Sequence, residues 1–188
     1  MHESLIQLLK SIAPFSDREL EQSLPFFHPQ TITKNAFFNK AGHISGKLGF
    51  VSRGLLRSFY ILKGKDTTTF FQLPGSVAVD LKSFVQKTAS IENIQAVTDT
   101  ELLVINRDDL YTLYTENWKW QQVGRILVED AYFEMEKRSI SLQIETAQDR
   151  YDQFLSEFPQ VIQQVPLHQI ASFLGISPET LSRIRKHR

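Results

Sequence analysis

The residues with the clearest chemical potential lie near the C-terminus, between positions 177 and 186. Glu179, Thr180 and Arg183 are spaced so that they share one face of a helix. On such a face, Arg183 can donate two hydrogen bonds to O6 and N7 of a guanine, and Glu179 can accept one from N4 of a cytosine. Sequence-specific contact with duplex DNA is the chemistry that these residues support. The candidate contact residues are Ser177, Glu179, Thr180, Arg183, Arg185 and Lys186.

This end of the chain is basic, although the whole chain carries 21 Lys and Arg against 21 Asp and Glu. From residue 159 onward the only acidic residue is Glu179. The cations in the same segment are Arg183, Arg185, Lys186 and Arg188. A local excess of positive charge attracts a phosphate backbone, and the free N–H groups that follow Ser177 suit a phosphate. The competing interpretation is a small helical subdomain whose basic end is solvated and contacts no DNA.

Two short helices around a tight turn would position these side chains, and residues 165–186 are predicted to form such a helix-turn-helix. Gly175 should end the first helix, because glycine tolerates a positive φ. Ser177 is a good N-cap for the second helix, and Pro178 stands at its first position, where a missing N–H has no cost. The apolar residues that should join the two helices are Leu167, Ile170, Ala171, Leu174, Leu181 and Ile184.

Upstream, residues 31–106 have the pattern of antiparallel β structure. Short β-rich runs alternate with glycine and polar turns, which is typical of a sandwich or barrel and not of a parallel α/β sheet. A short helix is expected over 80–87. The predicted strands cover 31–38, 48–52, 55–62, 67–73, 76–79, 91–97 and 101–105.

Helices are predicted on both sides of the β region. Residues 2–27 are helical in pattern, and Ser16 with Glu19 has the form of a capping box that begins a second helix. After the β region, a helix begins at Asp108 and Asp109. Longer helices follow over 116–142 and 145–157.

The long helix carries two apolar rows. Ile126, Phe133 and Ile140 recur every seven residues. The second row comprises Val128, Tyr132, Met135 and Leu142. A helix with two apolar rows should pack on its own domain and on something else. That second partner is either a twin helix across a two-fold axis or a second domain of the same chain; palindromic operators favour the homodimer.

Nearly the whole chain resembles the Crp/Fnr family of bacterial transcription regulators, whose sensory domain has the cyclic-nucleotide-binding fold. The resemblance rests on the order of a glycine-punctuated β-roll, a long helix and the segment Ile-Ser-Pro-Glu-Thr-Leu-Ser-Arg-Ile at 176–184. Two stretches support it: Gly-Leu-Leu-Arg-Ser-Phe-Tyr at 54–60 and Gln-Leu-Pro-Gly-Ser at 72–76. Together they look most like the divergent branch found in Bacteroidetes-type bacteria.

The fold class implied is α+β. An N-terminal antiparallel β-roll of the cyclic-nucleotide-binding type, a double-stranded β-helix or jelly roll with flanking helices, should occupy residues 1–115. A long dimerisation helix should follow over 116–144, and a C-terminal winged-helix or helix-turn-helix domain over 145–188. The pose of the helix-turn-helix should change at a hinge around 142–146.

The resemblance further implies a homodimer that reads a palindromic operator in double-stranded DNA, with Glu179 and Arg183 as base readers. RNA polymerase and an unidentified small-molecule effector are further candidate partners. Pro178 departs from the family, in which an arginine often stands at that position, so one base contact should be missing. The alternative function is a small-molecule-binding regulatory domain that acts through protein partners, with a helix-turn-helix that no longer reads DNA.

Control by cyclic AMP is not expected. Family members that bind it use a Gly-Glu pair for the ribose and an arginine followed by a small hydroxyl residue for the phosphate. The matching region, 77–93, contains no arginine, and Glu92 would repel a phosphate. The pocket should hold another small molecule or be a filled core. Its candidate residues are Arg57, Asp80, Lys82, Thr88 and Ser90.

Other chemistries lack the residues that they need. Cysteine is absent, which excludes disulfides, iron–sulfur clusters held by thiolates and cysteine nucleophiles. The five histidines are scattered, and no phosphate loop, dinucleotide fingerprint or Gly-x-Ser-x-Gly motif occurs, so no metal, cofactor or enzymatic activity is expected. No signal peptide and no apolar run of membrane-spanning length is visible, so a cytoplasmic protein that does not insert into the membrane is expected.

Overall fold

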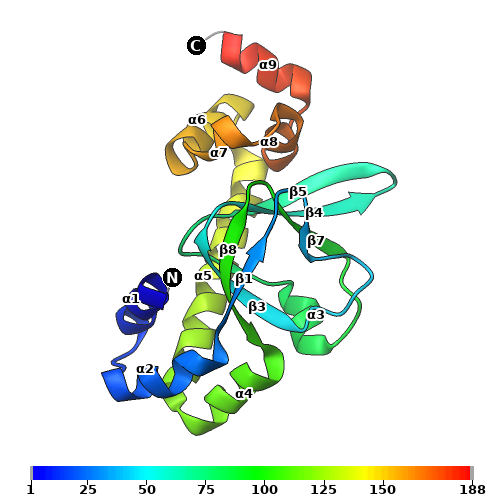
Figure 1. Ribbon diagram of the computed structural model, residues 1–188. Helices are drawn as coiled ribbons and strands as arrows, with labels where there is room; N and C mark the ends of the chain where they lie inside the picture. The colour runs from blue at the N-terminus through cyan, green and yellow to red at the C-terminus, as the bar shows by residue number, and fades with distance from the viewer. Residues whose placement is uncertain (1, 187–188) are drawn as a thin grey trace. The chain divides into compact units, whose positions relative to one another are not determined.

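The computed structural model describes residues 2–186 (Figure 1). Its first elements are two helices, α1 (His2–Ile12) and α2 (Asp17–Ser23), followed by the 3-10 helix η1 (Leu24–Phe26). Ser16 caps α2, because its hydroxyl oxygen accepts from the N–H of Glu19 at 3.3 Å. The Glu19 carboxylate accepts in return from the N–H of Ser16 at 2.7 Å. This reciprocal pair confirms the predicted capping box.

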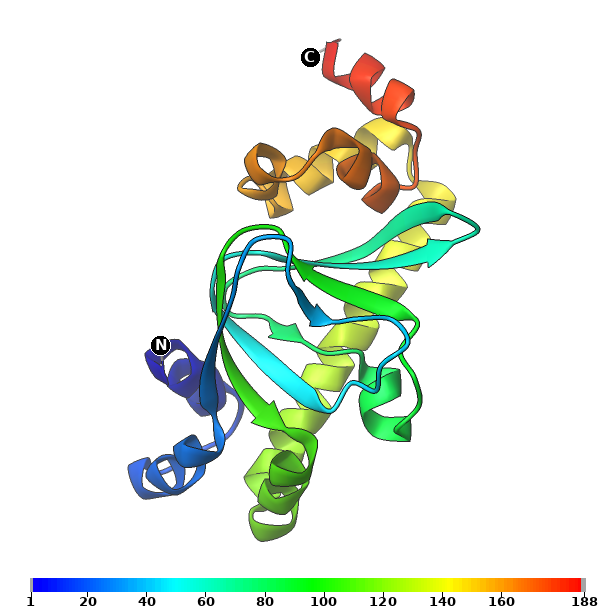
Figure 2. The ribbon, with the colours of Figure 1, turned by 45° about the vertical axis from the view of Figure 1, so that its right-hand side comes forward.

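The described residues that follow contain eight strands in two four-stranded sheets (Figures 1 and 2), ordered β1-β8-β3-β6 and β2-β7-β4-β5. β1 and β3 pair with β8, β3 with β6, and β2 with β7, all antiparallel, which confirms the predicted antiparallel β-roll. The short helix α3 (Leu81–Gln86) lies between β6 and β7 in sequence, as expected. The strands are β1 His28–Ile32, β2 Phe37–Asn39, β3 Lys47–Arg53, β4 Leu56–Leu62, β5 Lys65–Gln72, β6 Val77–Ala78, β7 Glu92–Ala96 and β8 Thr100–Asn106.

Strand β8 contributes to two separate apolar clusters. Leu102 and Val104 belong to the inner cluster, which contains residues of both sheets. Leu103 and Ile105 belong to an outer cluster with residues of α1 and of the helices that follow β8. Because successive side chains of a strand point to opposite faces, one apolar strand can serve both clusters. The outer cluster includes Leu5, Leu9, Phe50, Leu110, Leu113, Trp120 and Val123.

The prediction of one continuous strand over 31–38 is wrong, because the chain turns between β1 and β2. Asn35 adopts a φ of +68°, in the left-handed region that asparagine tolerates better than most residues. The N–H of Ala36 donates to the carbonyl oxygen of Thr33 at 2.9 Å, and the N–H of Lys34 donates to the Asp99 carboxylate at 2.8 Å. The turn is concealed in the sequence because β-branched residues precede it, at 31–33, and the strand-forming aromatic residues Phe37 and Phe38 follow it.

The predicted long helix is confirmed, but it begins two residues later than expected. Helix α4 (Arg107–Glu116) ends where the N–H of Asn117 donates to the carbonyl oxygen of Leu113 at 3.1 Å. The Asn117 side chain then accepts from the N–H of Lys119 at 3.0 Å, at the beginning of α5 (Trp118–Ile144). Asn117 therefore separates the two helices.

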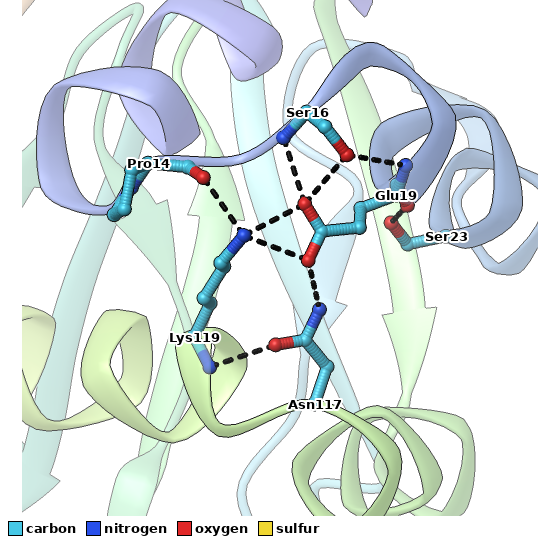
Figure 3. Close-up of polar contacts among 6 residues, drawn as sticks. All are labelled: Pro14, Ser16, Glu19, Ser23, Asn117 and Lys119. Carbon is cyan, nitrogen blue, oxygen red and sulfur yellow. Dashed lines mark hydrogen bonds and ion pairs between the residues drawn. The ribbon is translucent and has the colours of Figure 1, made fainter.

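A polar network fixes α2 to the start of α5 (Figure 3). Nζ of Lys119 lies 2.8 and 2.7 Å from the two carboxylate oxygens of Glu19 and 2.8 Å from the carbonyl oxygen of Pro14. Nδ2 of Asn117 donates to the same carboxylate at 2.9 Å. The hydrogen bond from Lys119, followed by those from Ser16 and Asn117, lowers the pKa of Glu19 to about 2. Glu19 is therefore charged at neutral pH.

The chain divides into two compact units: the residues up to Ser58 with Phe71–Asp130, and Phe59–Phe70 with the chain from Ala131 onward. The second unit contains the outer part of the β4–β5 hairpin, the C-terminal part of α5 and four shorter helices. These are α6 Ala147–Glu157, α7 Val161–Gln164, α8 Leu167–Phe173 and α9 Pro178–Lys186. The predicted wing has no counterpart among the described residues, because after residue 145 they contain helices and loops but no strand. The segment boundaries predicted at 115 and 144 stay a prediction.

Candidate nucleic-acid interface

The turn between α8 and α9 has the geometry that its glycine predicts (Figure 1). Gly175 adopts a φ of +68°. The N–H groups of Gly175 and Ile176 donate to the carbonyl oxygens of Ser172 and Ala171 at 3.2 and 3.0 Å. This pair of bonds is the Schellman motif, in which a left-handed residue ends a helix. The prediction that Gly175 ends the first helix is confirmed.

Helix α9 begins as the sequence predicts, with Ser177 as its N-cap. The Ser177 hydroxyl oxygen accepts from the N–H of Thr180 at 3.2 Å, and its carbonyl oxygen accepts from the N–H of Leu181 at 3.0 Å. Pro178 is the first helical residue. The Ser177 hydroxyl is thus used to cap the helix. Its predicted contact with a phosphate stays a prediction.

Helix α9 has one buried face and one exposed face. Leu181 is fully buried, and Ile170, Ala171 and Leu174 of the neighbouring helix are buried as well. Ile184 is half-buried, but Leu167, which was expected on the buried face, is exposed because it stands at the first position of α8. The structure gathers most of the predicted contact residues on solvent-exposed positions of α9. Glu179, Arg183, Arg185 and Lys186 are exposed and Thr180 is half-buried.

The first turns of α9 present an acceptor and a donor beside each other. A hydrogen bond from Ser177 lowers the pKa of Glu179, and the charge of Arg183 lowers it further, so Glu179 is charged at neutral pH. Nη2 of Arg183 lies 3.4 Å from the Thr180 hydroxyl. Arg185 and Lys186 stand in the last turn, where positive charge also complements the helix dipole. The predicted cation Arg188 lies outside the described residues.

Two residues that the sequence did not single out fix the position of α8. Nε and Nη1 of Arg150 in α6 donate to the carbonyl oxygens of Leu174 and Glu145, at 2.9 and 2.6 Å. The hydroxyl of Ser172 accepts from the N–H of Thr68 in β5 at 3.0 Å. Both contacts are made to main-chain groups, which every residue possesses. No sequence motif could therefore have revealed them.

In the β-roll, the candidate ligand residues Asp80 and Ser90 are brought together, but they bind each other. Asp80 caps α3, because one carboxylate oxygen accepts from the N–H of Ser83 at 3.0 Å. The other oxygen accepts from the Ser90 hydroxyl at 2.5 Å, and Ser90 also accepts from Nδ2 of Asn39 at 2.9 Å. These buried contacts hold the segment after α3 in place. The remaining candidates are dispersed: Lys82 and Thr88 are exposed, and Arg57 is buried in β4.

Two findings concern other kinds of site. Within residues 2–186, no three His, Cys, Asp or Glu side chains gather closely enough to hold a metal ion. Charged residues such as Glu129, Glu134 and Lys137 occur along α5, the longest helix. None of the helices in the described part of the chain combines the length and the apolar character that crossing a lipid bilayer requires.

The fold is that of bacterial transcription regulators of known structure. The catabolite activator protein of Thermus thermophilus matches with a TM-score of 0.61 and 22% identity, covering 96% of this chain and 85% of that one. The c-di-GMP-responsive global regulator CLP of Xanthomonas campestris matches with a TM-score of 0.72 and 15% identity, covering 92% and 91%. A regulator assigned to the Crp/Fnr family from Eubacterium rectale matches with a TM-score of 0.71 and 16% identity, covering 94% and 87%.

These similarities establish the class of fold. The chain has the Crp/Fnr-type architecture, with a cyclic-nucleotide-binding-like β-roll, a long helix and a C-terminal helix-turn-helix. No protein-family model and no curated protein matches the sequence.

Proposed function

We propose that this protein is a DNA-binding transcription regulator of the Crp/Fnr type. One observation carries the proposal: α9 is capped, docked through the fully buried Leu181, and presents Glu179, Thr180 and Arg183 toward solvent. In a helix-turn-helix, the N-terminal half of the second helix enters the major groove and contacts base edges. Arg183 would read a guanine, and Glu179 would accept from a cytosine. Ser177, Thr180, Arg185 and Lys186 would contact phosphates.

The regulator would act as a homodimer joined along α5. Val128, Tyr132, Met135, Ser139 and Leu142 follow a spacing of four and three residues, which is the heptad pattern of two-stranded coiled coils. The four apolar members of this row are each more than 40% exposed in the single chain. Phe133 and Ile140 of the second row are 59% and 49% exposed. Such exposure favours a twin helix over burial between two domains of one chain, and two copies would read a palindromic operator.

The mechanism would be a change of pose of the helix-turn-helix at the junction of α5 and α6. α5 ends at Ile144, and α6 begins with a capping box, in which Thr146 and Asp149 each accept a hydrogen bond from the other's N–H at 3.2 Å. An effector can shift such an equilibrium only if it binds the two poses with different affinity. Cyclic AMP is not proposed as that effector, because Asp80 is used in the cap of α3 and residues 77–93 contain no arginine. RNA polymerase would be a further partner, in the cytoplasm, and no catalytic role is proposed.

The test is selection of binding sites from a random duplex pool by the purified full-length chain, at near-physiological salt and without added effector. We expect enrichment of a two-fold symmetric site with half-sites about one helical turn apart. Arg183→Ala should weaken binding by about 1–3 kcal/mol and relax the preference at one base position in each half-site. Arg53→Ala is the matched control, because Arg53 is an exposed arginine on β3. If Arg183→Ala and Arg53→Ala bind DNA equally well and with the same base preference, Arg183 is not a base reader.

A further inference from the structure

A small cavity lies in the second unit, between the C-terminal part of α5, helix α6, the end of α8 and β5. Its walls include four aromatic rings, those of Phe70, Phe154, Phe158 and Phe173. The cavity measures about 70 Å³ and is open on one side. One water molecule needs roughly 10–15 Å³, and an engineered cavity of about 150 Å³ holds a benzene molecule. The space therefore accepts one end of a small molecule whose remainder lies in the open mouth.

The guanidinium of Arg138 lines this cavity and is nearly without partners. It lies 4.1 Å from the centre of the Phe173 ring, and its one hydrogen bond, to the carbonyl oxygen of Thr68, is long at 3.5 Å. Within residues 2–186 no carboxylate lies within ion-pair distance of it. The Arg138 side chain is partly buried, and this burial lowers its pKa. A partly buried guanidinium with five N–H donors and one long hydrogen bond can donate to a further acceptor.

The other charged groups around the cavity leave a surplus of positive charge. Nζ of Lys137 lies 2.6 Å from the Glu157 carboxylate, so these two charges balance each other. Arg150 donates to main-chain carbonyl oxygens and has no acidic partner of its own among the described contacts. Glu134 is the remaining acid, and its position on α5 is exposed. The lining thus has three cations against two acids, which suits a ligand with a single negative charge.

We propose that this cavity, the Arg138 pocket, binds a monocarboxylate with a small apolar body. The planar guanidinium of Arg138 matches a carboxylate in two-pronged fashion. The apolar body would pack against Phe154 and Phe158. This contact would remove apolar surface from water without burying an unpaired polar group. Binding itself does not depend on the function proposed above. The consequence does rest on it: because α5, α6, α8 and β5 all contribute to the pocket, the ligand would favour one pose of the helix-turn-helix.

Benzoate and hexanoate are the probes, and benzamide is the neutral control with the shape of benzoate. Isothermal titration of the full-length chain should show saturable binding of at least one acid, and benzamide should bind at least about tenfold more weakly, because it lacks a charge-assisted hydrogen bond. Arg138→Gln should reduce affinity for the acid by about tenfold or more, whereas Arg53→Ala should leave it unchanged. Arg138→Lys keeps the charge without the planar fork and should give an intermediate affinity, which keeps the test valid if Arg138→Gln folds poorly.

Two results would overturn the pocket: no binding of either acid at millimolar concentration, or equal affinity of benzoate and benzamide. Repeating the DNA selection with and without the bound acid separates this proposal from the proposed function. Acid binding that depends on Arg138, combined with a failure to enrich any DNA site in either condition, would leave the pocket in place and remove the DNA-binding function. Enrichment of a DNA site without acid binding would do the reverse.

Discussion

Each of the two units of the chain has a buried apolar core, but the polar contacts that supplement the core differ between them. In the first, fully buried Leu102 and Leu103 of β8 lie in two separate apolar clusters, one between the sheets and one beneath the helices. In the second, Ile170 and Leu181 are buried as well, and hydrogen bonds from Arg150 and Ser172 to main-chain atoms additionally fix the position of α8. Apolar burial contributes in proportion to area, whereas a typical hydrogen bond contributes only about 0.5–1.5 kcal/mol net.

These additional hydrogen bonds are compatible with the proposed change of pose of the helix-turn-helix. A few hydrogen bonds to main-chain carbonyl oxygens can be exchanged for others, or for bonds to water, at small net cost. A closely packed apolar cluster cannot be rearranged so cheaply, because each lost contact leaves a void.

The largest expected effects come from cutting one buried leucine in each unit. Leu102 and Leu181 are both 0% exposed, and replacing either with alanine should cost about 2–5 kcal/mol. Leu102→Ala should lower the midpoint temperature of the main unfolding transition. Leu181→Ala should speed hydrogen exchange in α8 and α9 while β3 and β8 keep their protection. Hydrogen exchange followed by mass spectrometry measures both. Equal loss of protection in β8 and α9 with Leu181→Ala would show that the units unfold as one.

The geometry of several helix ends could be predicted from the local sequence. The capping box of Ser16 and Glu19, the Schellman turn at Gly175 and the N-cap at Ser177 depend on residues within one turn of a helix, and all three predictions are confirmed. The outward face of α9 follows from the spacing of its apolar residues, because Leu181 stands on the opposite, buried face. Local rules are sufficient at these helix ends, where a capping side chain or a glycine marks the position, but they missed the local turn at Asn35.

The parts that could not be predicted depend on groups far apart in the chain. Asp80 and Ser90 are a carboxylate and a hydroxyl in the expected region, but only the folded backbone shows that they bind each other. Ser172 contacts a strand residue more than a hundred positions away, at Thr68. Arg138 carries no motif, and its place in the cavity, with no carboxylate of the described residues at ion-pair distance, cannot be read from a single sequence.

A smaller loss of stability should follow from Gly175→Ala, which tests how closely Leu142 of α5 packs against the turn at Gly175. A φ of +68° costs a residue with a side chain roughly 1–2 kcal/mol. A Cβ at Gly175 would also approach Cδ2 of Leu142 to 2.7 Å. Gly64 is the matched control, since its φ is +77° and nothing lies within 4 Å of a Cβ built there. In denaturant titrations Gly175→Ala should cost more than Gly64→Ala, and adding Leu142→Ala should remove the difference. Equal costs for the two glycines would mean that Leu142 moves aside freely.

The smallest effect at neutral pH is expected from Glu19→Gln, because the carboxylate only supplements the apolar cluster of the first unit. Its pKa is lowered from 4.5 to about 2, chiefly by the hydrogen bond from Lys119. A lowered pKa means that the charged form is favoured by folding, so the contribution is complete above pH 4.5 and is lost as the pH falls toward 2. Wild type should therefore unfold at a higher temperature than Glu19→Gln at pH 7.

The pH dependence separates this network from the apolar frame around it. The difference in melting temperature between wild type and Glu19→Gln should shrink below pH 4.5 and disappear near pH 2. Lys119→Met removes the main partner of the Glu19 carboxylate, so the pKa of Glu19 would return toward its ordinary value. In a chain that already carries Lys119→Met, Glu19→Gln should therefore lower the melting temperature by less. The substitution Leu102→Ala changes no titrating group, so the melting temperature of this variant should stay below that of wild type across the whole pH range. A constant deficit for Glu19→Gln from pH 7 to pH 2 would mean that the Glu19 side chain acts through packing and not through its charge.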